Sequence, residues 1–324
     1  MSQEITGIER NALGALAHLT PLIDQAQTFT SQAKARNTIK GYDNDWRHFT
    51  RWCAAQGLVS LPASSGTVAL YLTDLAQTHK ASTLTRRLSA ISQSHQAAGH
   101  DSPTHSSQVR LLMQGIRRTL GTAPETKAPL LADDIRRIGA NIPDTLLGKR
   151  DRALLLLGFA MAARRSELVG LDVTDLAEDR RGLVVTIRRS KTDQEGAGEK
   201  LGVPYSAEAA LCPVLAVRAW LAASRITEGP IFRTVDRHGR ILPARLSGEA
   251  VLLVVRKYAE QLGLDPQRFG GHSLRSGLAT SAAIAGKSER SIMAQTRHRS
   301  TGMVRRYIRD GSLFRENAMS GLLD

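Results

Sequence analysis

A stretch with two prolines near residue 125 interrupts the helical patterns on either side of it. The segment GTAPETKAPLL also contains a glycine and has few large apolar side chains. This composition favours an extended linker, because proline cannot continue a helix and little of the segment can be buried. We therefore predict a linker over residues 121–129, which separates about 120 residues from about 195 residues. A chain of 324 residues, 42% of them hydrophobic, is large enough to form one core on each side.

The segment before this break has the apolar spacing of a small helical bundle. Five apolar residues between Ile39 and Trp52 recur at steps of three or four, which places them on one face of a helix. Three further segments repeat the pattern and begin or end near Ser, Thr or Gly: SSGTVALYLTDLAQT, STLTRRLSAISQSHQAAG and SSQVRLLMQGIRRTLG. We expect a flexible N-terminus over residues 1–25 and a bundle of four to five helices over residues 26–120.

The segment after the break combines helices with one pair of strands. GLVVTIRRS and KLGVPYS carry β-branched residues on either side of the glycine-rich TDQEGAG, which is typical of a β-hairpin. Helices are predicted in LADDIRRIGANI, RDRALLLLGFAMAARRSELVGL, PVLAVRAWLAAS, EAVLLVVRKYAEQLG, the run after HSLRSG, and RENAMSGLLD. We therefore expect residues 130–324 to form a mostly helical domain with a small antiparallel β-sheet. The whole chain is predicted to be mainly α, with two domains.

The balance of charges indicates the kind of partner. The 44 Lys and Arg residues exceed the 30 Asp and Glu residues, so the formal net charge is +14. Such an excess of positive charge favours binding to a polyanion. Nucleic acid is the leading candidate, and a membrane surface is the alternative. No apolar run approaches the roughly 18–20 residues of a membrane-spanning helix, and the start MSQEITGIER lacks the features of a signal peptide. We expect a cytoplasmic protein that does not associate with membranes.

The spacing of cysteines and histidines argues against a disulfide framework and against a metal site. Cys53 and Cys212 each lie in an apolar helical context, which predicts buried thiols in a reducing compartment. The nine histidines have no Cys or His partners at metal-ligand spacing, so we expect no metal.

Two pairs of basic residues lie on predicted helices of the first segment. Arg86 and Arg87 form one pair, and Arg117 and Arg118 form the other. Guanidinium groups bind the phosphates of nucleic acids, so these four residues are candidates for DNA contact. The alternative is an ordinary solvated helix face, since basic pairs are common on protein surfaces.

Two motifs of the second segment place an arginine beside another polar group. GHSLRSGLAT puts His272 and Arg275 three residues apart, so both face the same side of a helix. Alone, this pair is more typical of a capped helix start. In AARRSEL, Arg164 lies three residues before Glu167 at the tip of an apolar helix, where a guanidinium can meet a phosphate with its planar fork. The adjacent Arg165 is the alternative.

A lysine, a second histidine and a tyrosine complete the set of candidate residues. Lys191 ends the first strand of the predicted hairpin, from which an ammonium can reach a neighbouring groove, and Lys200 on the other strand is the alternative. His298 precedes Tyr307 by nine residues, which along one helix would place them about 13 Å apart on opposite faces. A shared site therefore requires a break over residues 299–302. The helix of Tyr307 would then begin after His298, with Ser300 or Thr301 as its N-cap.

Taken in order, these residues resemble those of the tyrosine recombinases, the phage-integrase family of DNA strand-exchange enzymes. The likeness spans the chain, because that family joins a small helical DNA-binding domain to a C-terminal catalytic domain. The RSKT hairpin and the tail YIRDGSLFRENAMSGLL are most similar to the Cre branch. The family often has Leu-Gly before its last histidine, where this chain has Thr296 and Arg297. The matching residues are Arg164 in RRSEL, Lys191, His272 and Arg275 in HSLR, His298, and Tyr307 in RRYIR.

The resemblance implies a recombinase that cuts DNA through a 3′-phosphotyrosyl intermediate and exchanges strands through a Holliday junction. Arg164 and Arg275 would neutralise the scissile phosphate, which Tyr307 attacks. His272 would accept the tyrosine's proton, Lys191 would protonate the departing 5′ oxygen, and His298 would hydrogen-bond the phosphate.

The resemblance also implies the partners of the protein. These are double-stranded DNA with inverted-repeat recombination sites and three further copies of the chain in a homotetramer, with no cofactor. Two alternatives are a non-catalytic DNA-binding protein of the same fold and a type IB topoisomerase, which shares the tyrosine chemistry.

Overall fold

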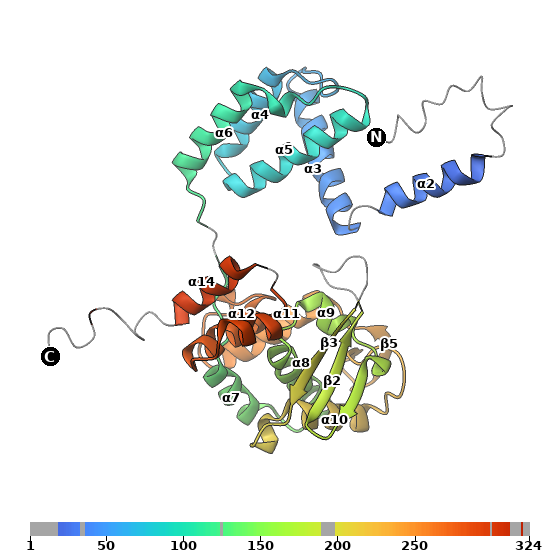
Figure 1. The fold of residues 1–324 in the computed structure, drawn as a ribbon, viewed down its shortest axis with the longest axis vertical. Coiled ribbons are helices and arrows are strands. Elements are labelled where there is room, and N and C mark those ends of the chain that lie inside the picture. Colours follow the sequence, from blue (N-terminus) through green and yellow to red (C-terminus); the bar gives the residue numbers. More distant parts are fainter. Residues whose placement is uncertain are drawn as a thin grey trace. The chain divides into compact units, whose positions relative to one another are not determined.

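The computed structural model describes residues 19–32, 36–123, 126–188, 198–298, 300–311 and 319. The chain folds into two compact units, Met1–Glu125 and Thr126–Asp324. Most described residues are helical, and the described strands form two small antiparallel sheets in the second unit (Figure 1). The predicted fold class, mainly α with a small antiparallel sheet, is therefore confirmed. None of the described helices is long and apolar enough to cross a membrane.

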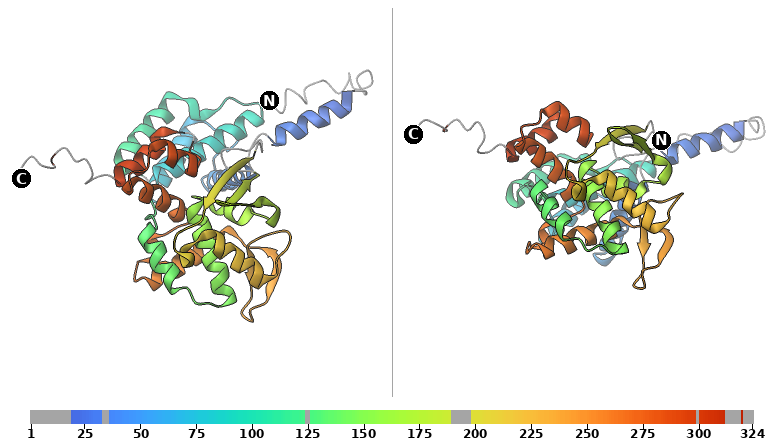
Figure 2. Two further views of the ribbon diagram at one scale, coloured as in Figure 1. Left: turned by 60° about the horizontal axis from the view of Figure 1, so that its bottom comes forward. Right: turned by 90° about the horizontal axis from the view of Figure 1, so that it is seen from below.

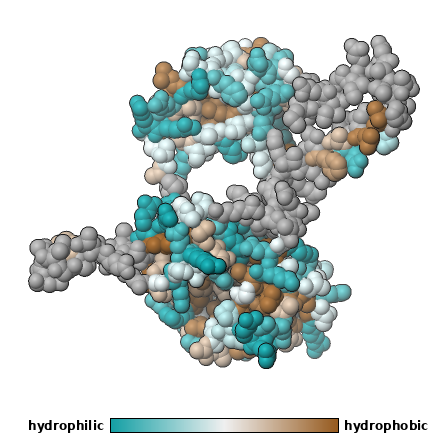
Figure 3. Space-filling view, in the orientation of Figure 1, coloured by the Kyte–Doolittle hydropathy of each residue, from teal (hydrophilic) through white to brown (hydrophobic). Residues whose placement is uncertain are grey.

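The first unit is a helical bundle. Its α2 helix begins at Thr20, so residues 20–25 are helical. We had expected a flexible terminus there. Pro21 lies in the first turn, where proline favours the start of a helix. Apolar residues show on the surface of α2 in Figure 3, and two of them, Leu22 and Phe29, are 60% and 64% exposed. The described helices are α2 (Thr20–Gln32), α3 (Arg36–Ala55), α4 (Ser65–Ala76), α5 (Ala81–Ala97), a short 3-10 helix (Pro103–His105) and α6 (Ser107–Leu120).

A polar cluster lies inside this bundle beside the apolar core. The core includes Cys53, a buried free thiol as predicted, and Tyr71, which is fully buried. The Tyr71 hydroxyl accepts a hydrogen bond from Arg87 Nη1 at 2.5 Å and lies 2.9 Å from His48 Nδ1. Asp45, only 5% exposed, lies 3.9 Å from Arg87 Nε and 2.7 Å from Arg86 Nη1. Arg87 therefore points into the bundle.

The second unit consists of helices around a central apolar helix, with the strands on one side. Its elements, in chain order, are α7 (Ala132–Asn141), α8 (Leu146–Ala160), α9 (Arg165–Gly170), β1 (Leu176–Asp179), β2 (Gly182–Ile187), β3 (Glu199–Pro204), α10 (Pro213–Ser224), β4 (Arg233–Val235), β5 (Ile241–Arg245), α11 (Gly248–Gln261), α12 (Ser273–Ile284), α13 (Glu289–Thr296) and α14 (Thr301–Gly311). Short 3-10 helices at Val173–Asp175, Ala209–Leu211 and Pro266–Arg268 connect some of them. The helix predicted in RENAMSGLLD falls almost entirely outside the described residues.

The α8 helix is the centre of this unit's core. Its residues 153–157 are all buried, which fits the run ALLLL, because a helix that is apolar on every side must be covered on every side. The α10 helix packs on one side of α8 and the α12 helix on another. Figures 1 and 2 show α12 and α14 together on one side of α8 and the strands β2 and β3 on the other. Cys212 is buried in this core as predicted.

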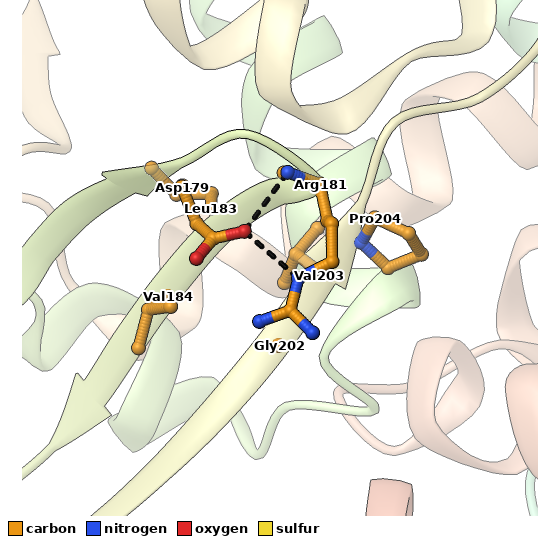
Figure 4. Close-up of a pocket in the computed structure, with 8 residues that line it drawn as sticks. Asp179, Arg181, Leu183, Val184, Gly202, Val203 and Pro204 are labelled. Atoms are coloured by element: carbon orange, nitrogen blue, oxygen red, sulfur yellow. Dashed lines mark hydrogen bonds and ion pairs between the residues drawn. The ribbon is translucent and has the colours of Figure 1, made fainter.

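The predicted hairpin forms β2 and β3, which pair antiparallel from Gly182↔Pro204 to Ile187↔Glu199. β1 adds a third strand to β2, and β4 and β5 form a separate two-stranded sheet. Figure 4 shows the turn between β1 and β2, where the Asp179 carboxylate accepts hydrogen bonds from the backbone N–H and Nε of Arg181. The hollow drawn there borders Gly182 and Pro204, at the opposite end of the sheet from Glu199.

Candidate active site

Arg275 is the most deeply buried of the predicted site residues that the structure describes. It lies in the first turn of α12 and is 1% exposed, and its Nη1 donates to the Ala162 carbonyl oxygen at 2.9 Å. Its Nε and Nη2 atoms are buried and have no hydrogen-bond partner among the described residues. A buried guanidinium that lacks partners for two nitrogens is costly, so this group is set up to bind an anion.

The position of α12 follows from small residues and backbone hydrogen bonds at its start. Ser273 Oγ accepts from the Gly270 N–H at 2.9 Å, and the Ser273 carbonyl accepts from the Leu130 N–H at 3.0 Å. A Cβ on Gly277 would lie 1.8 Å from the Leu130 carbonyl oxygen, so only glycine allows this approach. These contacts hold the start of α12, with His272 at its N-cap and Arg275 in its first turn, against Leu130, the residue that follows the predicted linker.

Arg164 lies at the N-cap of α9, beside a buried carboxylate. Glu167 Oε1 accepts from Arg164 Nη1 at 2.5 Å, and Oε2 accepts from the Arg164 N–H at 2.9 Å. The Arg164 side chain is 14% exposed, whereas the Glu167 side chain is 1% exposed. The alternative residue, Arg165, has a 41% exposed side chain and binds the Gly248 carbonyl and Glu249. Of the two arginines, Arg164 is therefore the one held in the cluster with Glu167.

A third arginine, which the sequence did not lead us to expect, is buried in the cluster and shares the same carboxylate. Arg297 Nη2 donates to Glu167 Oε2 at 2.6 Å, and Arg297 Nη1 donates to the Met161 carbonyl at 3.0 Å. Two guanidinium groups thus bind Glu167, and the charge of Glu167 also acts on Arg275. Burial raises the pKa of Glu167, but the charge of Arg297 and the hydrogen bonds from Arg164 outweigh it, so the pKa lies below its usual value. The carboxylate is therefore ionised, and the cluster keeps an excess of positive charge.

His298 and Tyr307 meet because the chain breaks between them, as predicted. α13 ends at Thr296 and α14 begins at Thr301. The rings of His298 and Tyr307 are 5.8 Å apart between centroids and tilted by 34°. Tyr307 packs against an apolar cluster formed by α12, α13 and α14. The break turns the two residues toward each other, as a shared site requires.

The hydrogen bonds of Thr296 assign the protonated nitrogen of His298. Thr296 Oγ1 donates to the Ile292 carbonyl at 2.6 Å and lies 2.7 Å from His298 Nδ1. Since the single hydroxyl proton is used on Ile292, Nδ1 must carry a proton and donate, which leaves Nε2 with a lone pair. Burial and the charges of Arg275 and Arg164 lower the pKa of His298 to about 4, so the ring is neutral near pH 7.

His272 and Arg275 belong electrostatically to the same cluster. The charge of His272 is among the influences that lower the pKa of His298. Burial, followed by the charges of Arg164 and Arg297, lowers the pKa of Arg275 to about 10, and Tyr307 also acts on this group. The side chain of His272 is exposed at the start of α12. The structure therefore brings together Arg164, His272, Arg275, His298 and Tyr307 of the six predicted residues.

Of the two candidate lysines, Lys200 belongs to the described part of the chain. Lys191 lies outside the described residues. Lys200 is exposed on β3, opposite Thr186 of β2. The described part of the chain contains no group of three or more His, Cys, Asp or Glu residues that could hold a metal ion.

The four candidate DNA contacts of the first unit fall into two groups. Arg86, Arg117 and Arg118 are exposed, although Arg86 pairs with Asp45. Arg87 is 8% exposed and engaged with Tyr71, so its guanidinium is not presented to a ligand. Its position three residues after Leu84 and four before Ile91, both fully buried, is the sequence signal that places it on the inner face.

The low pKa of His298 predicts a loss of stability in acid. An unfolded histidine titrates near pH 6.5, whereas folded His298 titrates near pH 4. Between these values the unfolded chain binds a proton that the native chain does not. The free energy of unfolding should therefore fall as the pH falls from about 6.5 to about 4, by up to about 3 kcal/mol. Urea denaturation at each pH measures it.

The matched variants for this test are His298→Gln and His238→Gln. Glutamine cannot gain the proton, so His298→Gln should flatten the pH dependence in this window. His238 is exposed, so His238→Gln should retain the wild-type slope. Equal slopes for the wild type and His298→Gln would contradict the account.

Comparisons with known proteins identify the family of the chain. The phage integrase family model matches residues 129–312. An integrase/recombinase xerD homolog from Selenomonas ruminantium is 42% identical over 300 residues, which cover 91% of this chain and 88% of the relative. The recombinase cre of Escherichia phage P1 is 25% identical, with 86% of this chain and 85% of the relative covered. These similarities do not single out the Cre branch.

Two solved structures show the same fold. The first is a lambda integrase(75-356) dimer bound to a COC′ core site, with a TM-score of 0.58, 18% identity, and 89% and 93% of the two chains covered. The second is the Tn1549 transposon integrase in complex with transposon right end DNA, with a TM-score of 0.59, 13% identity, and 89% and 95% covered.

Proposed function

Because the chain belongs to the phage integrase family and is a tyrosine recombinase, we propose that it exchanges DNA strands at specific sites through a 3′-phosphotyrosyl intermediate and a Holliday junction. Its substrate would be duplex DNA with inverted repeats, bound by four copies of the chain. The DNA-bound lambda and Tn1549 integrases, which share the fold, support DNA as the partner.

One observation carries this proposal. Nε and Nη2 of Arg275 are buried and lack a hydrogen-bond partner in the described part of the chain, in a cluster with excess positive charge. A phosphodiester supplies what is missing, because its non-bridging oxygens accept paired hydrogen bonds from a guanidinium. Arg164, whose charge also acts on Arg275, would bind the same phosphate.

The two arginines would then act on the transition state. Attack by Tyr307 Oη on phosphorus forms the phosphotyrosyl bond and breaks the bond to the 5′ oxygen. The pentavalent transition state carries more negative charge than the diester, so Arg164 and Arg275 stabilise it more strongly than the ground state. The new bond conserves the energy of the broken one, so a 5′ hydroxyl of another strand can reverse the step.

Proton transfers would fall to the remaining residues. His272 takes the proton of Tyr307, and Lys191 protonates the 5′ oxygen as it leaves. His298 approaches the phosphate with Nε2, which carries a lone pair in the DNA-free protein. A bound phosphate raises the pKa of a nearby histidine, so Nε2 gains a proton on binding and then donates to a phosphate oxygen.

We further propose that exposed arginines of the first unit contact the DNA backbone. Each neutralised phosphate contributes about −0.9 to the slope of log K against log salt concentration. The double variant Arg117→Gln/Arg118→Gln should therefore reduce the slope by up to about 2, measured by fluorescence anisotropy over a salt series. The exposed Arg225 of the second unit provides the control, and Arg225→Gln should leave the slope unchanged. An unchanged slope in the double variant would remove both residues from the interface.

The proposed function is tested by covalent capture on DNA from the protein's own genomic neighbourhood. Wild-type protein mixed with a fragment that contains inverted repeats should give an adduct that survives SDS, and a scrambled fragment should give none. A type IB topoisomerase would instead relax supercoiled plasmid of any sequence. A non-catalytic DNA-binding protein would protect the repeats without forming an adduct. Either of the last two results would overturn the proposal.

A further inference from the structure

The turn that precedes His298 contains a non-glycine residue in the left-handed conformation. Arg297, at the C-cap of α13, has φ 55° and ψ 42°. This region is unfavourable for residues with a Cβ, and glycine is the residue that adopts it freely. Ala162, the carbonyl partner of Arg275, also has a positive φ of 45°. Backbone strain of this kind persists where the surrounding contacts hold it, and both positions lie in the arginine cluster.

The contacts of Arg297 join three parts of the cluster. Its side chain is 2% exposed, with Nη1 on the Met161 carbonyl and Nη2 on Glu167 Oε2. Glu167 in turn holds both the backbone N–H and the guanidinium of Arg164. Arg297 is also the residue directly before His298. A continuous series of contacts thus runs from the His298 turn through Arg297 and Glu167 to Arg164.

We propose that Arg297 is a positioning residue for strand cleavage, which holds Glu167 so that the guanidinium of Arg164 and the ring of His298 keep a fixed relation to the scissile phosphate. This inference rests on the proposed function and adds a residue to it. Arg297 itself need not touch the DNA, because both of its Nη atoms are engaged within the protein.

Arg297 also changes the balance of charge around Glu167. With Arg164 as the only partner of Glu167, the pair would be close to neutral and Arg164 would attract a phosphate weakly. Arg297 supplies a second positive charge to the carboxylate, so the positive charge of Arg164 stays available. The charged groups that face Glu167 are Arg164 and Arg297. Glu167 also borders a hollow whose lining includes Asp175 and Arg188. Glu199 lies near Arg297 but is 3.9 Å from its Nε.

The decisive variant is Arg297→Gly, which removes the guanidinium and relieves the backbone at the same time. The rate of adduct formation at saturating DNA should fall about 10- to 100-fold, in line with the loss of a group that orients another. The dissociation constant for DNA should change much less, because Arg164 and Arg275 remain. The acid limb of the rate profile should also move to higher pH, since Arg297 is the largest influence that holds the Glu167 carboxyl ionised.

Arg225→Gly is a matched control within the same unit. Arg225 is also an arginine at a helix C-cap with a positive φ, 54°, but it is exposed at the end of α10. This variant relieves a similar backbone conformation and should leave the cleavage rate and the pH profile unchanged. Arg297→Lys restores the charge without the two-pronged contact, so it should recover part of the rate lost in Arg297→Gly.

A measurement on the DNA-free protein keeps this inference separable from the proposed function. In protein labelled with ¹³C at glutamate carboxyls, and assigned with Glu167→Gln, the Glu167 signal should titrate at higher pH in Arg297→Gly than in wild type. Absence of an adduct with wild-type protein would overturn the proposed function and this role with it. Wild-type adduct formation, with Arg297→Gly at the wild-type rate and an unmoved Glu167 titration, would overturn the role of Arg297 alone. A fall in rate equal in Arg225→Gly and Arg297→Gly would also overturn it.

Discussion

Replacement of Arg275 with methionine is expected to lower the rate of adduct formation by about 10³-fold or more, while the DNA-free protein unfolds at no lower temperature. The loss of rate follows from removing a full charge and two hydrogen-bond donors that would act on the transition state, since one such donor is worth about 10²–10³-fold. Single-turnover cleavage of a nicked substrate measures it.

The stability side of this prediction follows from the burial of Arg275. Its Nε and Nη2 are buried and unpaired among the described residues, and each such group costs on the order of 1–3 kcal/mol. Burial also lowers the pKa of this guanidinium to about 10, another sign that its charge is poorly accommodated without an anion. Methionine removes these costs and loses one hydrogen bond to Ala162, worth about 1.5–3 kcal/mol. Arg275→Met should therefore lower the cleavage rate without lowering the unfolding temperature.

Arg164→Met provides the contrast. Arg164 donates two hydrogen bonds to Glu167, so its removal leaves a buried carboxylate with Arg297 as its remaining side-chain hydrogen-bond partner in the described cluster. The backbone N–H of residue 164 is retained, but the guanidinium is not. This variant should lose cleavage and also unfold at a lower temperature, as thermal denaturation would report. Equal destabilisation by Arg275→Met and Arg164→Met would contradict the idea that the guanidinium of Arg275 lacks partners until a phosphate binds.

Segments with a long apolar run or a clear alternation were predictable from the sequence, and short strands were not. The run ALLLL in α8 is continuously apolar, and β2 and β3 are long enough to show the alternation of a strand. β4 has only three residues, Arg233–Val235, and β1 only four, so neither shows a pattern that distinguishes it from a loop. Their pairing depends on neighbours distant in sequence.

The candidate site was predictable where local spacing carries the information. The i, i+3 spacing of His272 and Arg275 and the break before α14 could both be argued from geometry. The role of Glu167 as a carboxylate shared by two arginines could not, because Arg297 reaches it from 130 residues away. The spacing of Arg87 from its apolar neighbours indicated that its side chain points inward. We had instead predicted a DNA contact from its charge.

The central claim is that Tyr307 forms the covalent bond to DNA. With a nicked substrate that traps the intermediate, wild-type protein should give an SDS-resistant adduct, and Tyr307→Phe should reduce it by about 10⁴-fold or more while binding DNA normally, because phenylalanine lacks the nucleophilic oxygen. Trypsin cleaves after Arg306 and Arg309, so the short peptide of residues 307–309 should carry the 3′-phosphate in mass spectra. An adduct that persists in Tyr307→Phe, or a nucleotide found on another peptide, would contradict the account.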